Sequence, residues 1–161
     1  MHTDDVDTPA LAALAGSELR YEVVRTKPAR SAEESAEFQG IEIQKLLRTI
    51  VLRRAENSYV FVLVPGGRTI DWPKLRAHLG ISRLSLPDAD EATAATGYQR
   101  GAITPFGSTT PWPVIADASI VGHDRIAIGG GARGVNLHIA ADELISFIGA
   151  EVADITKPAV S

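Results

Sequence analysis

A single lysine at the start of an apolar segment is the most distinctive charged residue of the sequence. Lys45 stands directly before Leu46 and Leu47, whereas the other lysines occur in polar or proline-flanked surroundings. Two uses of its ammonium group stay open. The stem can lie along the core while the charge reaches solvent, or the charge can be held at the mouth of the core. In the second case it would bind a phosphate or stabilise a developing oxyanion.

A glycine and a proline bracket the segment Gly101-Ala102-Ile103-Thr104-Pro105. Glycine adopts backbone angles that other residues avoid, and proline keeps the preceding residue, Thr104, out of the helical region. A stiff loop of this kind leaves backbone N–H and C=O groups without partners, so they can be directed at a carbonyl or ammonium group of a substrate. Ordinary surface turns share this composition, and the residues alone leave both readings open.

A second glycine-rich segment reads Gly129-Gly130-Gly131-Ala132-Arg133-Gly134. It fits the G-x-G-x-x-G spacing of dinucleotide-binding loops, and an acidic residue, Asp154, follows at a suitable distance. That mechanism requires a helix N-terminus directly after the glycines to face the pyrophosphate. Residues 135–139 instead alternate like a strand. We therefore predict a turn between two strands and treat nucleotide binding as a remote alternative, although glycines also let a backbone approach a ligand closely.

Metal and thiol chemistry find little support. None of His2, His78, His123 and His138 has a metal-ligand spacing to another histidine, and His138 is expected to face outward from a strand. Cysteine is absent, which removes thiol nucleophiles and disulfides and suits a reducing cytoplasm. No Gly-x-Ser-x-Gly elbow occurs, so a Ser-His-Asp arrangement stays open but unsupported. We expect Asp117, at a strand end, to accept a structural hydrogen bond.

Short helices and strands must position these residues. Helices are predicted to begin at the capping residues Thr8, Ser31, Asp71 and Asp88 and to stop near Gly16, Gly40, Gly80 and Gly97, with a last helix over 142–148 before Gly149. Strands are predicted over residues 20–25, 46–53, 59–64, 114–117, 125–128, 135–139 and 151–155, with a long loop over 97–113. Hairpin-like pairs of strands with helices between them favour a mixed, mostly antiparallel α+β fold over a βαβ repeat.

The length and the net charge of the chain narrow the possible functions further. We expect the 161 residues to form one domain over 1–161, with 1–7 and 156–161 as loose ends. The acidic N-terminus lacks the features of a signal peptide and no apolar run is long enough for a membrane helix, which predicts an intracellular protein away from membranes. The net charge of −4 argues against a protein that contacts many phosphates. If RNA binds, we expect the contact to be confined to a small end of the molecule or to be helped by another protein.

Four segments, in order, resemble the YbaK and prolyl-tRNA synthetase-associated editing-domain family over about residues 20–155. They look like the family's entry helix with its lead-in (26–36), its lysine-bearing strand (45–51), its signature loop (96–107) and its closing hairpin, helix and strand between 129 and 155. The resemblance implies a mixed, partly barrel-like sheet surrounded by helices.

The resemblance also implies an activity, the hydrolysis of the ester between a mischarged amino acid and the 3′ end of a tRNA. A freestanding enzyme of this kind acts in trans on a small residue, alanine or cysteine, with proline tRNA as the first candidate. By the same resemblance, Lys45 would hold the terminal phosphate while Gly101 and Pro105 form the loop that positions the aminoacyl group. The remaining substrate-binding residues would be Ala102, Ile103, Thr104, Gly129, Gly130 and Gly131.

The resemblance further implies that neither a metal nor an organic cofactor is used. The expected partner is the 3′ end of a mischarged aminoacyl-tRNA, an aminoacyl-tRNA synthetase is a second candidate partner, and the expected location is the cytoplasm. Cysteine-editing members carry a serine, a lysine and an aspartate where this chain has Gly129, Ala132 and Asn136. The amino-acid specificity therefore stays open, and the alternative is a non-catalytic module of the same fold that binds tRNA or a synthetase.

Overall fold

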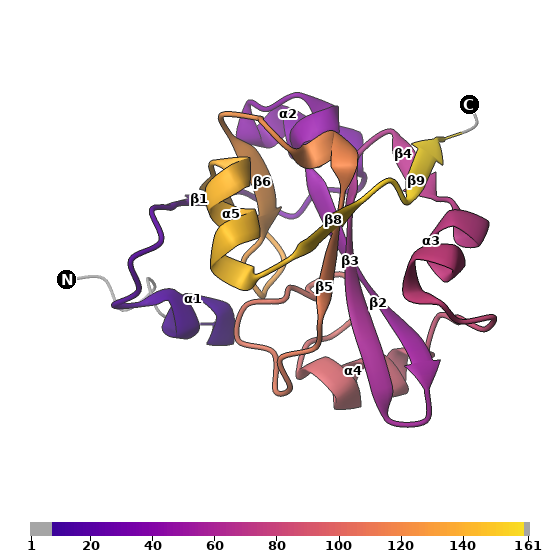
Figure 1. Ribbon diagram of the computed structural model, residues 1–161. Coiled ribbons are helices and arrows are strands. Elements are labelled where there is room, and N and C mark those ends of the chain that lie inside the picture. The colour runs from indigo at the N-terminus through magenta and orange to yellow at the C-terminus, as the bar shows by residue number, and fades with distance from the viewer. Residues whose placement is uncertain (1–7, 160–161) are drawn as a thin grey trace.

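The structure is a computed structural model in which residues 8–159 are described (Figure 1). Across these residues the chain forms the helices α1 (Pro9–Leu14), α2 (Ala32–Gln39), α3 (Trp72–Leu79), α4 (Ala89–Thr96) and α5 (Ala141–Ile148), and the short 3-10 turns η2 (Ile43–Lys45) and η3 (Ala118–Ile120). The predicted caps are confirmed, since the side chains of Thr8, Ser31, Asp71 and Asp88 each accept a hydrogen bond from a backbone N–H in the first turn. These caps satisfy donors that a helix start leaves without partners.

The strands of the described region are β1 (Glu22–Arg25), β2 (Leu47–Ala55), β3 (Ser58–Pro65), β4 (Arg68–Ile70), β5 (Val114–Asp117), β6 (Ile126–Gly129), β7 (Val135–Ile139), β8 (Glu151–Ala153) and β9 (Thr156–Pro158). They form three sheets, with the orders β1-β7-β6, β2-β3-β5-β8 and β4-β9. Only the pairs β3–β5 and β5–β8 are parallel, so the prediction of a mixed, mostly antiparallel α+β fold is confirmed. A parallel bridge between Leu46 and Ala127 joins the first two sheets, which curve around the core without closing.

The central strand β3 separates two apolar clusters. Residues of a strand alternate between its two faces. Phe61 and Leu63 accordingly pack into the larger cluster with residues of α1, α4 and α5, while Val60, Val62 and Val64 pack into a second cluster with Leu75 of α3. Figure 1 shows α3 on one side of this sheet and α1 and α5 on the other. Burial on both faces explains why the sequence of β3 is apolar throughout instead of alternating.

The expectation of a loose end over residues 156–161 is wrong for 156–158. These residues form β9, which pairs in antiparallel register with β4, and Thr156 is 1% exposed. Arg68 of β4 donates to the Thr156 hydroxyl over 2.6 Å. Three-residue strands carry almost no periodicity, so only long-range pairing reveals them. Residues 1–7 and 160–161, predicted as loose ends, lie outside the described part of the chain.

Candidate functional site

A cavity of about 900 Å³ lies between β2, the loop 97–113 and the turn that joins β6 to β7. Its walls are formed by Ala32, Ser35, Leu46, Leu47, Arg48, Thr49, Ile50, Val51, Leu86, Pro87, Asp88, Ala92, Arg100, Gly101, Ile103, Gly129 and Asn136. These residues come from segments that are far apart in the sequence. The fold therefore brings the start of β2, the predicted loop and the glycine run to one hollow.

A smaller compartment of about 190 Å³ adjoins this cavity. Ser35, Gly101, Ile103, Gly129 and Asn136 line both spaces and form the junction between them. Beyond the junction the smaller compartment is lined by residues of the segment 26–31 and of the glycine run. A narrow space opening into a wide one suits a ligand with a small group attached to a larger body.

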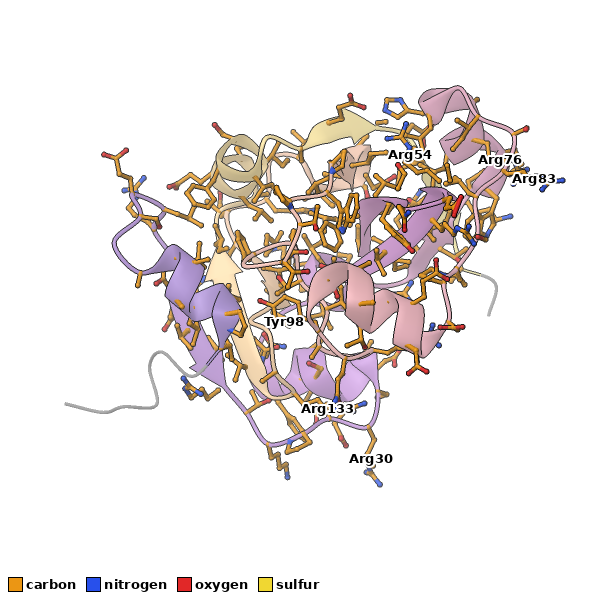
Figure 2. The ribbon with its side chains drawn as sticks, turned by 90° about the horizontal axis from the view of Figure 1, so that it is seen from below. Arg30, Arg54, Arg76, Arg83, Tyr98 and Arg133 are labelled. Atoms are coloured by element: carbon orange, nitrogen blue, oxygen red, sulfur yellow. The ribbon has the colours of Figure 1, made fainter. Side chains whose placement is uncertain are left out.

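The predicted binding loop is held in a fixed shape. Gly101 has a φ of 94°, and a Cβ atom at this position would lie 3.0 Å from Arg133 Nη2. Tyr98 donates from its hydroxyl to the Phe106 carbonyl over 2.6 Å and closes the loop. Burial raises the pKa of Tyr98 to about 12, so the phenol keeps its hydrogen for this bond at neutral pH. In Figure 2, Arg133 lies below Tyr98, and Arg30 extends from the edge of the molecule beyond it.

The loop residues divide into those that line the hollow and those that support it. Gly101 and Ile103 line both compartments and Ala102 lines the smaller one. Thr104 is fully buried with an unpartnered hydroxyl, and neither it nor Pro105 is among the lining residues. Within residues 8–159, the backbone N–H groups of Ile103 and Thr104 make no hydrogen bond. Of these two groups, the N–H of Ile103 belongs to a residue that lines the hollow and is a candidate donor to a ligand oxygen.

Lys45 lies at the edge of the hollow. It ends η2 and is separated from β2 by Leu46, so it precedes the strand that was expected to carry it, and its Nζ is 3.1 Å from Glu42 Oε1. The side chain is 30% exposed and lines neither compartment, whereas the next residue, Leu46, lines the larger one. The ammonium group is therefore paired with Glu42 one residue outside the cavity wall.

The glycine run forms a hairpin turn, as predicted. Gly129 pairs with Asn136 in the antiparallel ladder of β6 and β7, and no helix follows the glycines. Gly129 lines both compartments and Gly131 the smaller one, whereas Gly130 is buried beneath them. A Cβ atom on Gly131 would lie 3.1 Å from Tyr98 Cε1, so the turn packs closely against the loop. This geometry removes the helix dipole on which dinucleotide binding depends.

Two arginines add positive charge to the larger cavity. Arg48 donates to the Arg68 carbonyl over 3.1 Å, and Arg100 donates to the Pro87 carbonyl over 2.6 Å. Both line the cavity wall, and a guanidinium has further N–H donors to offer a ligand. Phosphate groups are the ligands that such donors favour.

His138 is buried, which corrects the expectation that it faces outward. It is 5% exposed, and its ring nitrogens lie 2.9 Å from Gln39 Oε1 and 3.0 Å from Arg125 Nη1. Burial, and then the charge of Arg125, lower the pKa of His138. Alternation along β7 does turn His138 away from the main core. The opposite face is covered by Gln39 of α2, and no local pattern reveals that cover.

Asp117 has the structural role that the sequence indicates. It is 1% exposed and accepts hydrogen bonds from the backbone N–H groups of Ser119 and Ile155, each over 3.1 Å, and from the Ser119 hydroxyl. Burial raises the pKa of this carboxyl, but the hydrogen bonds from Ser119 and Ile155 outweigh it and the net pKa is lowered. The carboxylate thus ties β5 to the segment after β8.

Several cavity residues were not predicted as site residues from the sequence, above all Ser35 and Thr49, and Asn136 was noted only as a departure from the cysteine-editing pattern. Ser35 occupies an unremarked position of a predicted helix, and the buried hydroxyl of Thr49 has no partner. Among residues 8–159, no three histidine, aspartate or glutamate side chains gather where they could hold a metal ion. No helix of this region has the length and apolar character needed to cross a membrane.

Comparison with known proteins gives consistent matches. Residues 26–147 match the sequence model of the aminoacyl-tRNA editing domain. The chain is 27% identical over 136 residues to "Putative Cys-tRNA(Pro)/Cys-tRNA(Cys) deacylase EbsC" of Enterococcus faecalis, covering 84% of this chain and 83% of the relative. It is 31% identical over 114 residues to the proline–tRNA ligase of Thermosipho africanus, covering 71% of this chain but only 20% of the ligase.

Solved structures extend the likeness to the fold. A structure described as "a putative trans-editing enzyme for prolyl tRNA synthetase" superimposes with a TM-score of 0.80 at 25% identity, covering 92% of both chains. The hypothetical protein APE2540 superimposes with a TM-score of 0.84 at 21% identity, covering 92% of this chain and 99% of that one.

Proposed function

Because the chain belongs to the aminoacyl-tRNA editing domain family, we propose that it is a trans-acting aminoacyl-tRNA deacylase. Its substrate is a small mischarged amino acid, alanine or cysteine, esterified to tRNA, with proline tRNA as the first candidate. One observation carries the proposal: the loop Gly101-Ala102-Ile103, the glycine turn and the start of β2 surround a single hollow with a narrow and a wide compartment.

The chemistry needs little beyond positioning. An aminoacyl ester is already activated, so a site must orient a water molecule or a substrate group, stabilise an oxyanion and exclude larger side chains. The unpartnered N–H of Ile103 is the proposed oxyanion donor. The narrow compartment is the proposed place for the amino acid, because a steric wall rejects a larger side chain more strongly than attraction selects a smaller one.

The wide compartment is the proposed place for the terminal nucleotide of the tRNA. Arg48 and Arg100 supply charge at its wall, and Lys45 stands one residue outside it. In the proposal, the ammonium group exchanges Glu42 for the terminal phosphate when the tRNA binds. The loop's Pro105 and Thr104 hold Gly101 and Ile103 in place from behind. The cytoplasm is the proposed location, since charged tRNA is used there, and a synthetase is the proposed second partner.

Deacylation of defined substrates tests this function. Purified protein is incubated with Ala-, Cys- and Ser-tRNA-Pro, and the loss of the ester is followed for wild type and for Lys45→Ala. We expect wild type to deacylate at least one of these substrates and Lys45→Ala to lose most of the activity, because the phosphate contact that positions the ester is gone. Lys157→Ala, an exposed lysine of β9, is the matched control and should retain full activity.

The second candidate function is a non-catalytic module that binds tRNA or a synthetase. The observations that favour it are the pairing of Lys45 with Glu42 and the lack of ionisable side chains at Gly129, Ala132 and Asn136. If wild type releases no amino acid from any of the three substrates yet retains tRNA on a filter, this second function replaces the first.

A further inference from the structure

A chain of hydrogen bonds runs from Arg125, the residue before β6, to the wall of the hollow. Arg125 Nη1 lies 3.0 Å from His138 Nδ1, and His138 Nε2 lies 2.9 Å from Gln39 Oε1. Gln39 Nε2 then donates to Ser35 Oγ over 2.9 Å. Three of these four residues are outside the proposed machinery, but Ser35 lies at the junction of the two compartments. We refer to Arg125, His138, Gln39 and Ser35 as the relay.

The direction of every bond in the relay follows from its first member. A guanidinium can only donate, so Nδ1 of His138 must accept and the ring hydrogen must be on Nε2. Nε2–H can then donate only to the amide oxygen of Gln39, which turns the amide NH₂ toward Ser35. Arg125 is itself held by Glu22, whose Oε1 is 2.9 Å from Nη1. The lowered pKa of His138 agrees with this neutral tautomer.

The end of the relay is a hydroxyl with a free hydrogen. Since Ser35 Oγ accepts from Gln39, its own hydrogen must point elsewhere, and within residues 8–159 no protein group accepts it. A serine on a helix often donates back to the preceding turn, but no such bond occurs here. Ser35 lines the junction together with the loop residues Gly101 and Ile103, so the hollow is a space that its hydroxyl hydrogen can enter.

We propose that Ser35 is a substrate-contacting residue whose hydroxyl donates a hydrogen bond to an oxygen of the aminoacyl ester, and that Gln39 and His138 are positioning residues that fix the direction of this donor. The inference rests on the proposed function, which supplies the ester. With the amino acid in the narrow compartment and the nucleotide in the wide one, the ester oxygens come to the junction. A donor whose orientation is fixed beforehand needs no rearrangement when charge develops on the oxygen.

Two variants separate this role from a structural one. Ser35→Ala removes the donor while keeping a good helix former, and we expect kcat/KM for deacylation to fall about 10- to 100-fold, as for one hydrogen bond made in the transition state. Gln39→Glu is nearly isosteric but presents an acceptor to Ser35, so the hydroxyl hydrogen turns away from the substrate. The same loss is expected for Gln39→Glu, whereas Ser146→Ala, an exposed helical serine of α5, should leave the rate unchanged.

The double variant provides the decisive comparison. If Gln39 acts through Ser35, adding Gln39→Glu to Ser35→Ala should cause no further loss of kcat/KM. A purely structural effect of Gln39→Glu would instead reduce the rate equally in both backgrounds and would overturn its positioning role. Thermal unfolding of each variant accompanies the kinetics, and His138→Gln, which keeps one donor and one acceptor, should retain more activity than His138→Leu.

Nuclear magnetic resonance tests the direction of the relay without reference to activity. The nitrogen-15 shifts of the His138 ring, identified by their loss in His138→Gln, should show the hydrogen on Nε2 and a bare Nδ1. A hydrogen on Nδ1 would overturn the relay. Active wild type with an unaffected Ser35→Ala would overturn the inference alone. Inactive wild type would overturn the proposed function and, with it, the substrate assigned to Ser35.

Discussion

At the scale of single residues, the site depends on glycines as much as on side chains, because at some positions a side chain would not fit. Gly101 combines a φ of 94° with a neighbouring guanidinium, and Gly131 faces the Tyr98 ring. Such positions were visible in the sequence as glycines, but what they approach was not. His138 is a similar case, because its partners Gln39 of α2 and Arg125 are far from it in the sequence and no local pattern reveals them.

Substitution of Gly101 separates backbone strain from crowding of the site. Gly101→Ala should lower kcat/KM for deacylation at least about 10-fold, because the new methyl displaces Arg133 and shifts the loop. Gly16→Ala is the matched control, since Gly16 has a φ of 80° and open space around its Cβ position. Each variant should lose about 1–2 kcal/mol of stability through its left-handed backbone, but only Gly101→Ala should lose activity. Equal activities in kinetic assays would contradict the role of this loop.

At the scale of secondary-structure elements, the sequence predicted the helices and strands that carry a local signal, such as a capping residue or an apolar run. Ser31 and Gly40 bound α2 as expected, and the apolar run of β3 marked the central strand. The strands β4 and β9 were missed because three residues give no period, and their pairing joins segments far apart in the chain. The hollow was predictable only through the family resemblance, since its walls meet by tertiary packing of α2, β2 and the β6–β7 turn.

Asp117 is the residue through which several of these elements are joined. Asp117→Asn should lower the free energy of unfolding by about 1–3 kcal/mol at pH 7, because a charged acceptor with several donors becomes a neutral amide. The pKa of Asp117 in the folded protein is lowered below its ordinary value of 3.8. The extra stability of wild type is therefore fully present above pH 3.8 and is lost as the pH falls through the folded pKa. Urea denaturation of both proteins at pH 7 and near pH 3 measures this, and a difference that persists unchanged in acid would contradict it.

At the scale of the whole molecule, the net charge is negative and the labelled arginines lie in different parts of the structure. The net charge is −4, and several arginines lie away from the hollow. Figure 2 shows Arg54, Arg76 and Arg83 near one corner, far from Arg133, which lines the narrow compartment. Within the proposed function, phosphate contact is therefore limited to Lys45, Arg48 and Arg100 around the wide compartment.

This limited contact predicts a shallow salt dependence of tRNA binding. About three phosphate contacts to single-stranded RNA give a slope of log K against log salt near roughly −2. Filter binding between 50 and 200 mM salt, about a fourfold range, checks the slope, and Arg48→Ala should make it shallower by about one contact. A much steeper slope of log K against log salt would contradict this prediction, because it would mean that the protein also contacts phosphates in the body of the tRNA.

The parallel pairing of β5 between β3 and β8 has a consequence for synthesis on the ribosome. All four residues of β5 are buried in the finished molecule, yet its partner β8 is encoded more than thirty positions later, after the hairpin and α5. A nascent chain that has emerged only as far as β5 therefore presents a bare, apolar sheet edge, the kind of surface that chaperones recognise and that other unfinished chains can pair with. The emergence of β8 closes that edge and ends the exposure.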